Sequence, residues 1–199
     1  MKKVFLILSP LLFLLLGGFS SHVKNKVNDY LNTGDTIVFN SIVYKLVWSS
    51  HPADNYYKQE YIPENEKVKK YKNMLLIDFV VTPDSVASLV KQKGIEILER
   101  KKTDIMVNYH LGYKSASKEY LLDFVFSEGS GGGLSIVEWN GYIYKDYTDK
   151  QGHRGILLFG LSKRAYDPDI TPFMQGLKIN RQVDLSTLLQ FTLPDVEIK

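Results

Sequence analysis

The chain has 199 residues, a formal net charge of +3 and no cysteine. The lack of cysteine excludes a disulfide framework, zinc–cysteine and iron–sulfur sites, and thiol catalysis. With 44% hydrophobic and 24% charged residues, the composition is that of a folded protein rather than a disordered one, and the length suits one domain.

The first twenty residues have the three-part pattern of a secretory signal peptide. Lys2 and Lys3 precede an almost wholly apolar run over residues 4–16, and small residues follow up to Ser20. The apolar run is shorter than the roughly 20 residues that span a membrane. We therefore predict a signal peptide over residues 1–20, cleaved after Ser20. An uncleaved signal anchor is the alternative, because no Ala-x-Ala site is present.

Cleavage after Ser20 changes the charge argument. Loss of Lys2 and Lys3 leaves 179 residues with a net charge of +1. The basic excess is then too small to indicate nucleic acid or an acidic membrane as a partner, and no membrane span is expected in the mature chain. A chain of this length buries about 70% of its unfolded surface without disulfides. We expect an exported bacterial protein of the periplasm or the extracellular space.

The first half of the mature chain predicts a short helix followed by strands. Residues 21–35 have apolar side chains at helical spacing, with a flexible tether as the alternative. Asn40 and Ser41 then indicate either a small hairpin or a bulge between two β-rich stretches. The remaining segments are a strand to residue 48, a loop over 51–55, a strand over 56–62, one or two helical turns over 64–72, and a central strand over 74–81.

The second half predicts one helix, a meander of strands and a final helix. Thr82-Pro83-Asp84 is a helix start with Thr82 as the cap, and a C-terminal helix starts near Asp167, with a break near Asp184. The strands between these helices cover residues 105–113, 118–126, 134–147 and 155–162. Asn140-Gly141 is either a turn that splits the third of these strands or a bulge within it.

These elements predict one α+β domain over residues 36–199. Its core is a single twisted antiparallel sheet of about six or seven strands, packed with two or three helices.

Motifs that resemble catalytic or metal sites fail on inspection. The glycine-rich stretch over 128–133 lacks the Lys of a phosphate loop and the following helix, so it is interpreted as a hairpin loop. None of the four histidines has the spacing of a metal site, and Asp167-x-Asp169 is interpreted as helix capping rather than as part of a calcium loop. We expect no metal, no cofactor and no catalytic residue from these motifs.

Tyrosine is the unusual feature of the composition, with 13 in the chain. Strand alternation places Tyr57 and Tyr61 on one face, with Glu60 opposite, and Tyr142 and Tyr144 together on a face. Tyrosines of this kind either pack a sheet or line a wet pocket. Arg164 is either a surface residue or the partner of Glu60 or Glu138. The candidate ligand-binding residues are Tyr57, Glu60, Tyr61, Trp139, Tyr142, Tyr144 and Arg164.

Two stretches resemble a family of uncharacterised exported bacterial proteins. The first is Tyr57-Lys58-Gln59-Glu60-Tyr61-Ile62-Pro63-Glu64-Asn65-Glu66, followed by Tyr71 and Met74, and the second is Ser162-Lys163-Arg164-x-Tyr166. The family pattern is E-Y-x-P-x-x-E, then an aromatic residue and a Met before a strand. This resemblance implies an exported α+β protein and no assigned activity.

Three functions follow as hypotheses. The first is an exported, non-enzymatic domain that binds a small molecule, a peptide or an envelope partner. The second is a hydrolase whose residues meet only in the fold, with His110, Ser130 and Asp123 as an example. The third is a structural component of a cell-envelope complex, with the tyrosine-rich faces as its interface.

Overall fold

A computed structural model describes residues 27–130 and 133–199. The predicted signal peptide, and residues 21–26 of the predicted helix or tether, lie outside the described residues. Residues 27–35 contain turns but no helix. This stretch packs on the domain, because Leu31 is fully buried and accepts a backbone hydrogen bond from Glu197 in the C-terminal tail.

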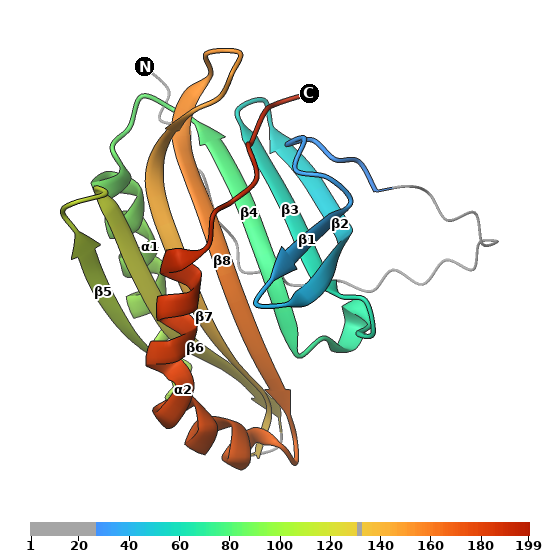
Figure 1. Ribbon diagram of the computed structural model, residues 1–199. Coiled ribbons are helices and arrows are strands. Elements are labelled where there is room, and N and C mark those ends of the chain that lie inside the picture. The colour runs from blue at the N-terminus through green and yellow to red at the C-terminus, as the bar shows by residue number, and fades with distance from the viewer. Residues whose placement is uncertain (1–26, 131–132) are drawn as a thin grey trace.

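Eight strands form one antiparallel sheet, in the order β1-β2-β3-β4-β8-β7-β6-β5 (Figure 1). The first four strands make one meander and the last four make another. Helix α1 connects the two, and β8 returns beside β4 in the middle of the sheet. The strands are β1 (Thr36–Phe39), β2 (Ile42–Ala53), β3 (Tyr56–Pro63), β4 (Asn73–Val81), β5 (Asn108–Lys114), β6 (Glu119–Ser130), β7 (Gly133–Thr148) and β8 (Arg154–Tyr166).

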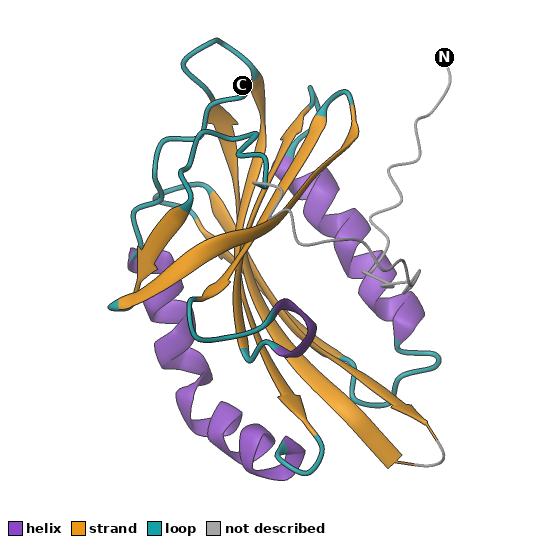
Figure 2. Cartoon of the chain, turned by 90° about the vertical axis from the view of Figure 1, so that its right-hand side faces the viewer, coloured by secondary structure: helices purple, strands orange, loops and turns teal. Residues whose placement is uncertain are grey.

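Two α-helices cover opposite faces of the sheet (Figure 2). Helix α1 (Val86–Arg100) packs on one face and α2 (Ile170–Gln190) on the other, and a short 3-10 helix, η1 (Val68–Lys70), lies between β3 and β4. The α+β class and the single antiparallel sheet predicted from the sequence are confirmed. The larger apolar core lies on the α2 face, where Leu75, Ile77 and Phe79 of β4 are completely buried.

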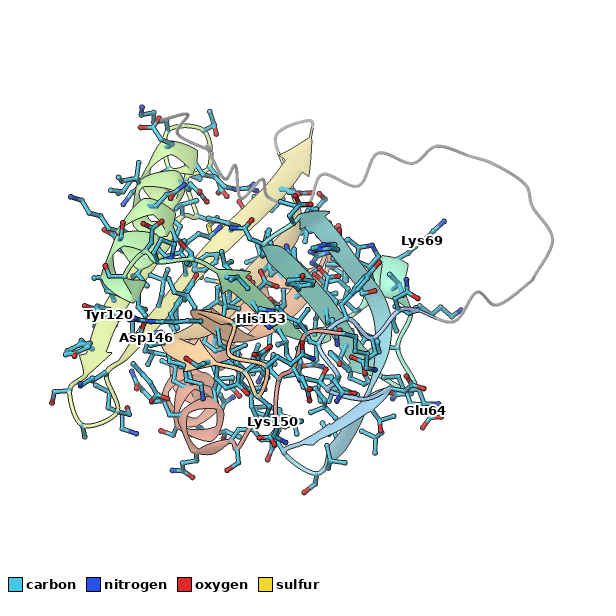
Figure 3. All side chains as sticks on the ribbon, turned by 90° about the horizontal axis from the view of Figure 1, so that it is seen from above. Glu64, Lys69, Tyr120, Asp146, Lys150 and His153 are labelled. Atoms are coloured by element: carbon cyan, nitrogen blue, oxygen red, sulfur yellow. The ribbon has the colours of Figure 1, made fainter. Side chains whose placement is uncertain are left out.

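The β3–β4 connection lies at one side of the molecule, opposite to β6. Seen from above, Glu64 and Lys69 of the β3–β4 connection lie on one side of the molecule, and Tyr120 of β6 lies on the opposite side (Figure 3). The polar connection between β3 and β4 is tied down by Glu66, whose carboxylate accepts hydrogen bonds from the backbone of Lys72 and Asn73. This anchoring places Tyr71, which precedes β4, against the α1 face of the sheet.

The sheet has eight strands, so the predicted six or seven is wrong. The difference arises at the first hairpin, where Asn40 and Ser41 both have positive φ angles (47° and 64°) and form a tight turn. That turn makes the four-residue β1 a separate strand instead of a bulge. The predicted loop at 51–55 is also shorter, because β2 continues to Ala53.

Three further expectations are corrected. Ser85, not Thr82, caps α1: its side chain accepts the Ser88 N–H at 3.2 Å. Helix α2 runs without a break past Asp184, and its N-cap Asp169 makes no side-chain capping bond. Residues 140 and 141 keep regular register with both neighbouring strands, so β7 is one continuous strand with neither a turn nor a bulge there.

Candidate functional site

A cavity of about 160 Å³ lies on the α1 face of the sheet. Its wall comes from five strands, from α1 and from Tyr71 in the β3–β4 connection. Helix α1 covers the β5–β7 side of this face, so the cavity lies between the helix and the β3–β4 side. The lining residues that matter below are Tyr56, Lys58, Glu60, Tyr71, Asp78, Lys93, Arg100, Phe124, Phe126, Glu138, Asn140, Tyr142, Tyr144, Ser162 and Arg164.

The two faces of the sheet separate by residue parity. On β3, β4, β6, β7 and β8, the residues that line the cavity have even numbers, with the exception of Ser127 at the end of the lining on β6. The odd-numbered residues of β4 and β8, such as Phe79 and Phe159, pack in the core against α2. Side chains alternate between the two faces along a strand. The register of the strands therefore decides which residues lie on the cavity face.

Four of the predicted ligand-binding residues line the cavity and three do not. Glu60, Tyr142, Tyr144 and Arg164 are in its wall. The other three belong to the core on the α2 face: Tyr57, Tyr61 and Trp139.

Those three core residues have their own partners on the α2 face. Tyr57 stacks on His51 with 4.2 Å between ring centroids. The Tyr61 hydroxyl lies 2.6 Å from the Thr33 hydroxyl, and the Trp139 indole donates to Asp123 at 3.2 Å. The polar tips of Tyr61 and Trp139 and the ring of Tyr57 are therefore engaged within the fold.

Glycine at position 160 places one aromatic wall of the cavity. A Cβ at this position would lie 2.6 Å from Cδ1 of Tyr142 and 3.2 Å from Cδ1 of Leu76. Gly160 and Tyr142 are direct partners in the β7–β8 register. The missing side chain therefore leaves room for the Tyr142 ring to lie across β8 at the cavity floor.

Every cation in the cavity wall rests on an aromatic ring. Arg164 lies 4.2 Å over the Tyr71 ring, and Arg100 lies 4.5 Å over the Phe126 ring. Lys93 lies 5.8 Å from the Phe124 centroid, and Lys58 lies 5.7 Å from the Tyr56 centroid. Such contacts stabilise a cation where solvent is restricted.

The same cations also have carboxylate partners. Arg164 donates to Oε2 of Glu138 at 2.7 Å, so the predicted pairing of Arg164 with Glu138 is present. Lys93 is paired with Glu96 at 3.2 Å, and Arg100 with Asp104 at 3.3 Å. Lys58 is 3.9 Å from Oδ2 of Asp78. The positive charges of the wall are thus largely neutralised by the protein itself.

Asp78 has one satisfied oxygen and one orphaned oxygen. Its Oδ2 accepts the Tyr56 hydroxyl at 2.7 Å, whereas its Oδ1 is buried without a partner among the described residues. The orphaned oxygen is notable because the Asp78 residue is only 6% exposed. Buried polar atoms normally have a hydrogen-bond partner, so each exception calls for an explanation.

Asn140 presents a matching orphaned donor. Its side-chain oxygen accepts from the hydroxyls of Ser162, at 2.5 Å, and Tyr142, at 3.1 Å. Its Nδ2 is buried and, within the described part of the chain, has no acceptor. Asp78 and Asn140 therefore supply one acceptor and one donor to the same cavity wall.

Glu60 is the buried carboxyl of the wall that has no hydrogen-bond partner or ion pair among the described residues. Burial raises the pKa of Glu60 to about 7. Neighbouring charges act in both directions: Asp78 and Glu138 raise this pKa, and Lys58 and Arg164 lower it. Glu60 therefore changes charge near neutral pH, inside a wall of aromatic rings.

Burial also raises the pKa of the tyrosines in the wall. The pKa values of Tyr56, Tyr71 and Tyr142 all lie well above the usual 10, chiefly because of desolvation and then because of nearby carboxylates. These hydroxyls therefore stay protonated and serve as hydrogen-bond donors and apolar surface at any physiological pH.

The sequence reasoning missed several members of the site. Asp78, with one partnered and one orphaned oxygen, was not among the candidate ligand-binding residues. Asn140 was considered only for a turn or a bulge, Tyr56 only as a strand residue, and Lys58 only as part of a strand and of the family-like stretch. The available signal was parity, since all of these share the even-numbered face with Glu60.

The fold does not bring the three residues of the hydrolase hypothesis together. His110 and Asp123 are register partners on β5 and β6, with 3.9 Å between His110 Nδ1 and Asp123 Oδ2. Asp123 is held on the α2 face by a two-point contact with Arg181, at 2.6 Å to each oxygen. Ser130 is seven residues further along β6, about 23 Å away in an extended strand. The strand therefore does not bring Ser130 to the pair.

Other polar clusters serve the fold. His153 and the backbone of its turn bind Asp149, and Asp104 accepts hydrogen bonds from Ser127 and Met106. No group of three or more metal-ligating side chains occurs among the described residues. No helix in the described ranges is long and apolar enough to cross a membrane.

The fold and the cavity define an α+β protein whose single antiparallel sheet bears, on one face, an aromatic-lined cavity with a few buried polar groups. Residues 31–193 match the model of a bacterial protein family of uncharacterised function, and the chain belongs to that family. The match covers both meanders, α1, all of α2 and every cavity residue. No curated protein and no solved structure matches the chain.

Proposed function

We propose that this protein binds a small molecule in the cavity on the α1 face. The observation that carries the proposal is the coincidence of two buried, orphaned polar atoms, Asp78 Oδ1 and Asn140 Nδ2, with an aromatic-lined cavity. Cavities of this kind, apolar overall with a few convergent polar groups, are the usual form of small-molecule sites.

The volume sets the size of the ligand. A cavity of about 160 Å³ is close to the roughly 150 Å³ cavity that holds benzene in an engineered protein. The enclosed part of the ligand is therefore about the size of one six-membered ring. A peptide segment or a larger molecule would place only one side chain or one end group in this space.

We propose further that the protein acts outside the cytoplasm. The support is the basic, apolar and small pattern of residues 1–20, which is typical of a cleaved export signal. Expression of the full chain in a bacterium, with mass spectrometry of the mature N-terminus, tests this. A mature product that begins near residue 21 in the periplasm or medium supports export, and an intact N-terminus in the cytoplasm contradicts it.

The binding proposal is tested with ring-sized probes and a matched pair of variants. Ligand-observed NMR with a library of small aromatic and aliphatic amines, alcohols and acids would identify compounds that bind the wild-type chain. Asp78→Asn changes a cavity carboxylate without changing its size. Asp146→Asn makes the same change at an exposed position of β7.

The two variants separate binding in the cavity from binding elsewhere. Compounds that bind wild type and Asp146→Asn, but bind Asp78→Asn at least about tenfold more weakly, support the cavity as the site. If no compound binds, or if all compounds bind the three proteins equally, the proposed function is wrong.

A further inference from the structure

The proposed binding function leaves the ligand class open, and the charge balance of the cavity narrows it. Arg164, Lys93 and Arg100 each have a carboxylate partner within 3.3 Å and a ring beneath them. An anionic ligand would have to compete with those partners. The cavity therefore has little unpaired positive charge to offer an acid or a phosphate.

The carboxyl groups of Glu60 and Asp78 supply the unpaired acidic atoms of the wall. Glu60 has no ion-pair partner among the described residues, and Asp78 has an orphaned oxygen on the adjacent strand. In the β3–β4 register, Glu60 is opposite Leu76 and Lys58 is opposite Asp78, so the two carboxyl groups are diagonal neighbours on one face. Lys58 offsets one of the two negative charges, which leaves one in excess when Glu60 is ionised.

Aromatic rings surround this excess charge. Tyr56, Tyr71, Tyr142 and Tyr144 line the same cavity, and the three cations on Phe124, Phe126 and Tyr71 show that its rings already accept positive charge. A ring face attracts a cation most strongly where water is restricted. Carboxyl groups and ring faces together make the chemistry that recognises a protonated amine.

On these grounds we propose that the cavity binds a small primary amine in its protonated form. Its ammonium group would lie at Glu60 and Asp78 Oδ1, and its apolar body, of about one ring, would pack on the tyrosines. An ammonium has three N–H donors and no acceptor, which suits two carboxyl groups. This inference rests on the proposed function and specifies that the ligand carries a positive charge.

The geometry implies that binding depends on pH. The groups that face Glu60 are Lys58 on its own strand, Asp78 on β4, Glu138 and Tyr142 on β7, and Arg164 on β8, with Tyr71 from the β3–β4 connection. The pKa of Glu60 itself is raised to about 7. Below that pH the carboxyl is neutral and loses its attraction for an ammonium, whereas an alkylamine with a pKa similar to that of lysine remains charged.

Titration calorimetry with isosteric probes tests the inference. Benzylamine and benzyl alcohol have the same ring, and only the amine is charged. At about pH 8.5 we expect benzylamine to bind wild type at least about tenfold more tightly than benzyl alcohol, and at about pH 5.5 we expect this advantage to fall to about threefold or less. Benzoate should bind more weakly than either probe.

Glu60→Gln is the decisive variant, because it keeps the shape of the side chain and removes its charge. It should bind benzyl alcohol about as well as wild type, and it should show little change of benzylamine affinity with pH. Glu64→Gln makes the same change at an exposed position and should behave as wild type. Circular dichroism shows whether each variant is folded; if Glu60→Gln does not fold, the wild-type pH profile decides.

The outcomes separate the ligand class from the binding function. If benzyl alcohol binds as tightly as benzylamine at about pH 8.5, the amine assignment is wrong and the cavity function stands. If benzoate binds most tightly, the assignment is also wrong and the arginines are the recognition groups. If none of the probes of this size binds at millimolar concentration, the amine assignment falls, and the library screen above decides the fate of the binding function.

Discussion

Glu60 should destabilise the protein at high pH, and the size of the effect follows from its burial. In the fold its pKa is raised to about 7, from an ordinary value of 4.5 that applies to the unfolded chain. The protonated form is therefore favoured by folding. Below about pH 4.5 the group is neutral in both states and carries no penalty. The penalty grows between pH 4.5 and 7 and is complete above pH 7.

The expected magnitude is about 3 kcal/mol. The difference between pKa values of 4.5 and about 7 corresponds to this free energy at about 1.4 kcal/mol per pH unit. Glu60→Gln is neutral at every pH, so it should gain about 3 kcal/mol over wild type as the pH rises from about 4.5 to 8. Any pH-independent effect of the substitution on the free energy of unfolding cancels when the two pH values are compared.

Urea unfolding at a series of pH values measures this difference directly. The free energy of unfolding of Glu60→Gln minus that of wild type should rise with pH and level off above neutrality. Glu64→Gln supplies the control, since its side chain is 63% exposed, and its difference from wild type should stay within about 0.5 kcal/mol. If the free energies of unfolding of Glu60→Gln and wild type run parallel from about pH 4.5 to 8, Glu60 is not a buried carboxyl with a raised pKa and the reasoning fails.

Other predictions concern the frame around the cavity. Arg181→Met should lower the free energy of unfolding by about 1–3 kcal/mol in chemical denaturation, because it leaves the buried Asp123 carboxylate without its 2.6 Å partner; no loss would mean that water replaces the arginine. Gly155→Ala should cost more than about 3 kcal/mol or prevent folding, since a Cβ would lie 2.0 Å from the Val80 carbonyl oxygen. Gly94→Ala, with open space in α1, should instead raise the melting temperature by stabilising the helix by about 1 kcal/mol; the opposite order of these two variants would contradict the packing described.

Local patterns predicted most of the strands because period-two alternation and turn residues are local properties. The boundaries of β3 were predicted within one residue, and β4 was predicted as a central strand from its apolar run. The errors lie where a local signal was ambiguous. Thr82 and Ser85 are both good caps, and the helix begins where Ser85 makes the bond. Asn140-Gly141 is typical of a hairpin, but pairing with both β6 and β8 keeps β7 continuous.

The site was predicted only in part because alternation identifies which residues share a face and not what covers that face. Glu60 and Tyr61 were correctly expected on opposite faces, yet both were candidates for one site. The choice between faces depends on where α1 and α2 pack, which is a tertiary property. Tyr61 lies under the core with α2, whereas Glu60 lies on the face that α1 covers incompletely. The candidate set therefore mixed two faces of the sheet.

The contrast between the two faces is itself an argument for function. On the α2 face, β4 presents Leu75, Ile77 and Phe79, all fully buried and apolar. On the α1 face the same strand presents Asp78, while β3 adds Glu60 and β7 adds Asn140, each at most 6% exposed. Burial of such groups costs stability that apolar side chains at these positions would not lose. A sheet shaped by stability alone would be apolar on both faces, so the polar wall is best explained by what the cavity binds.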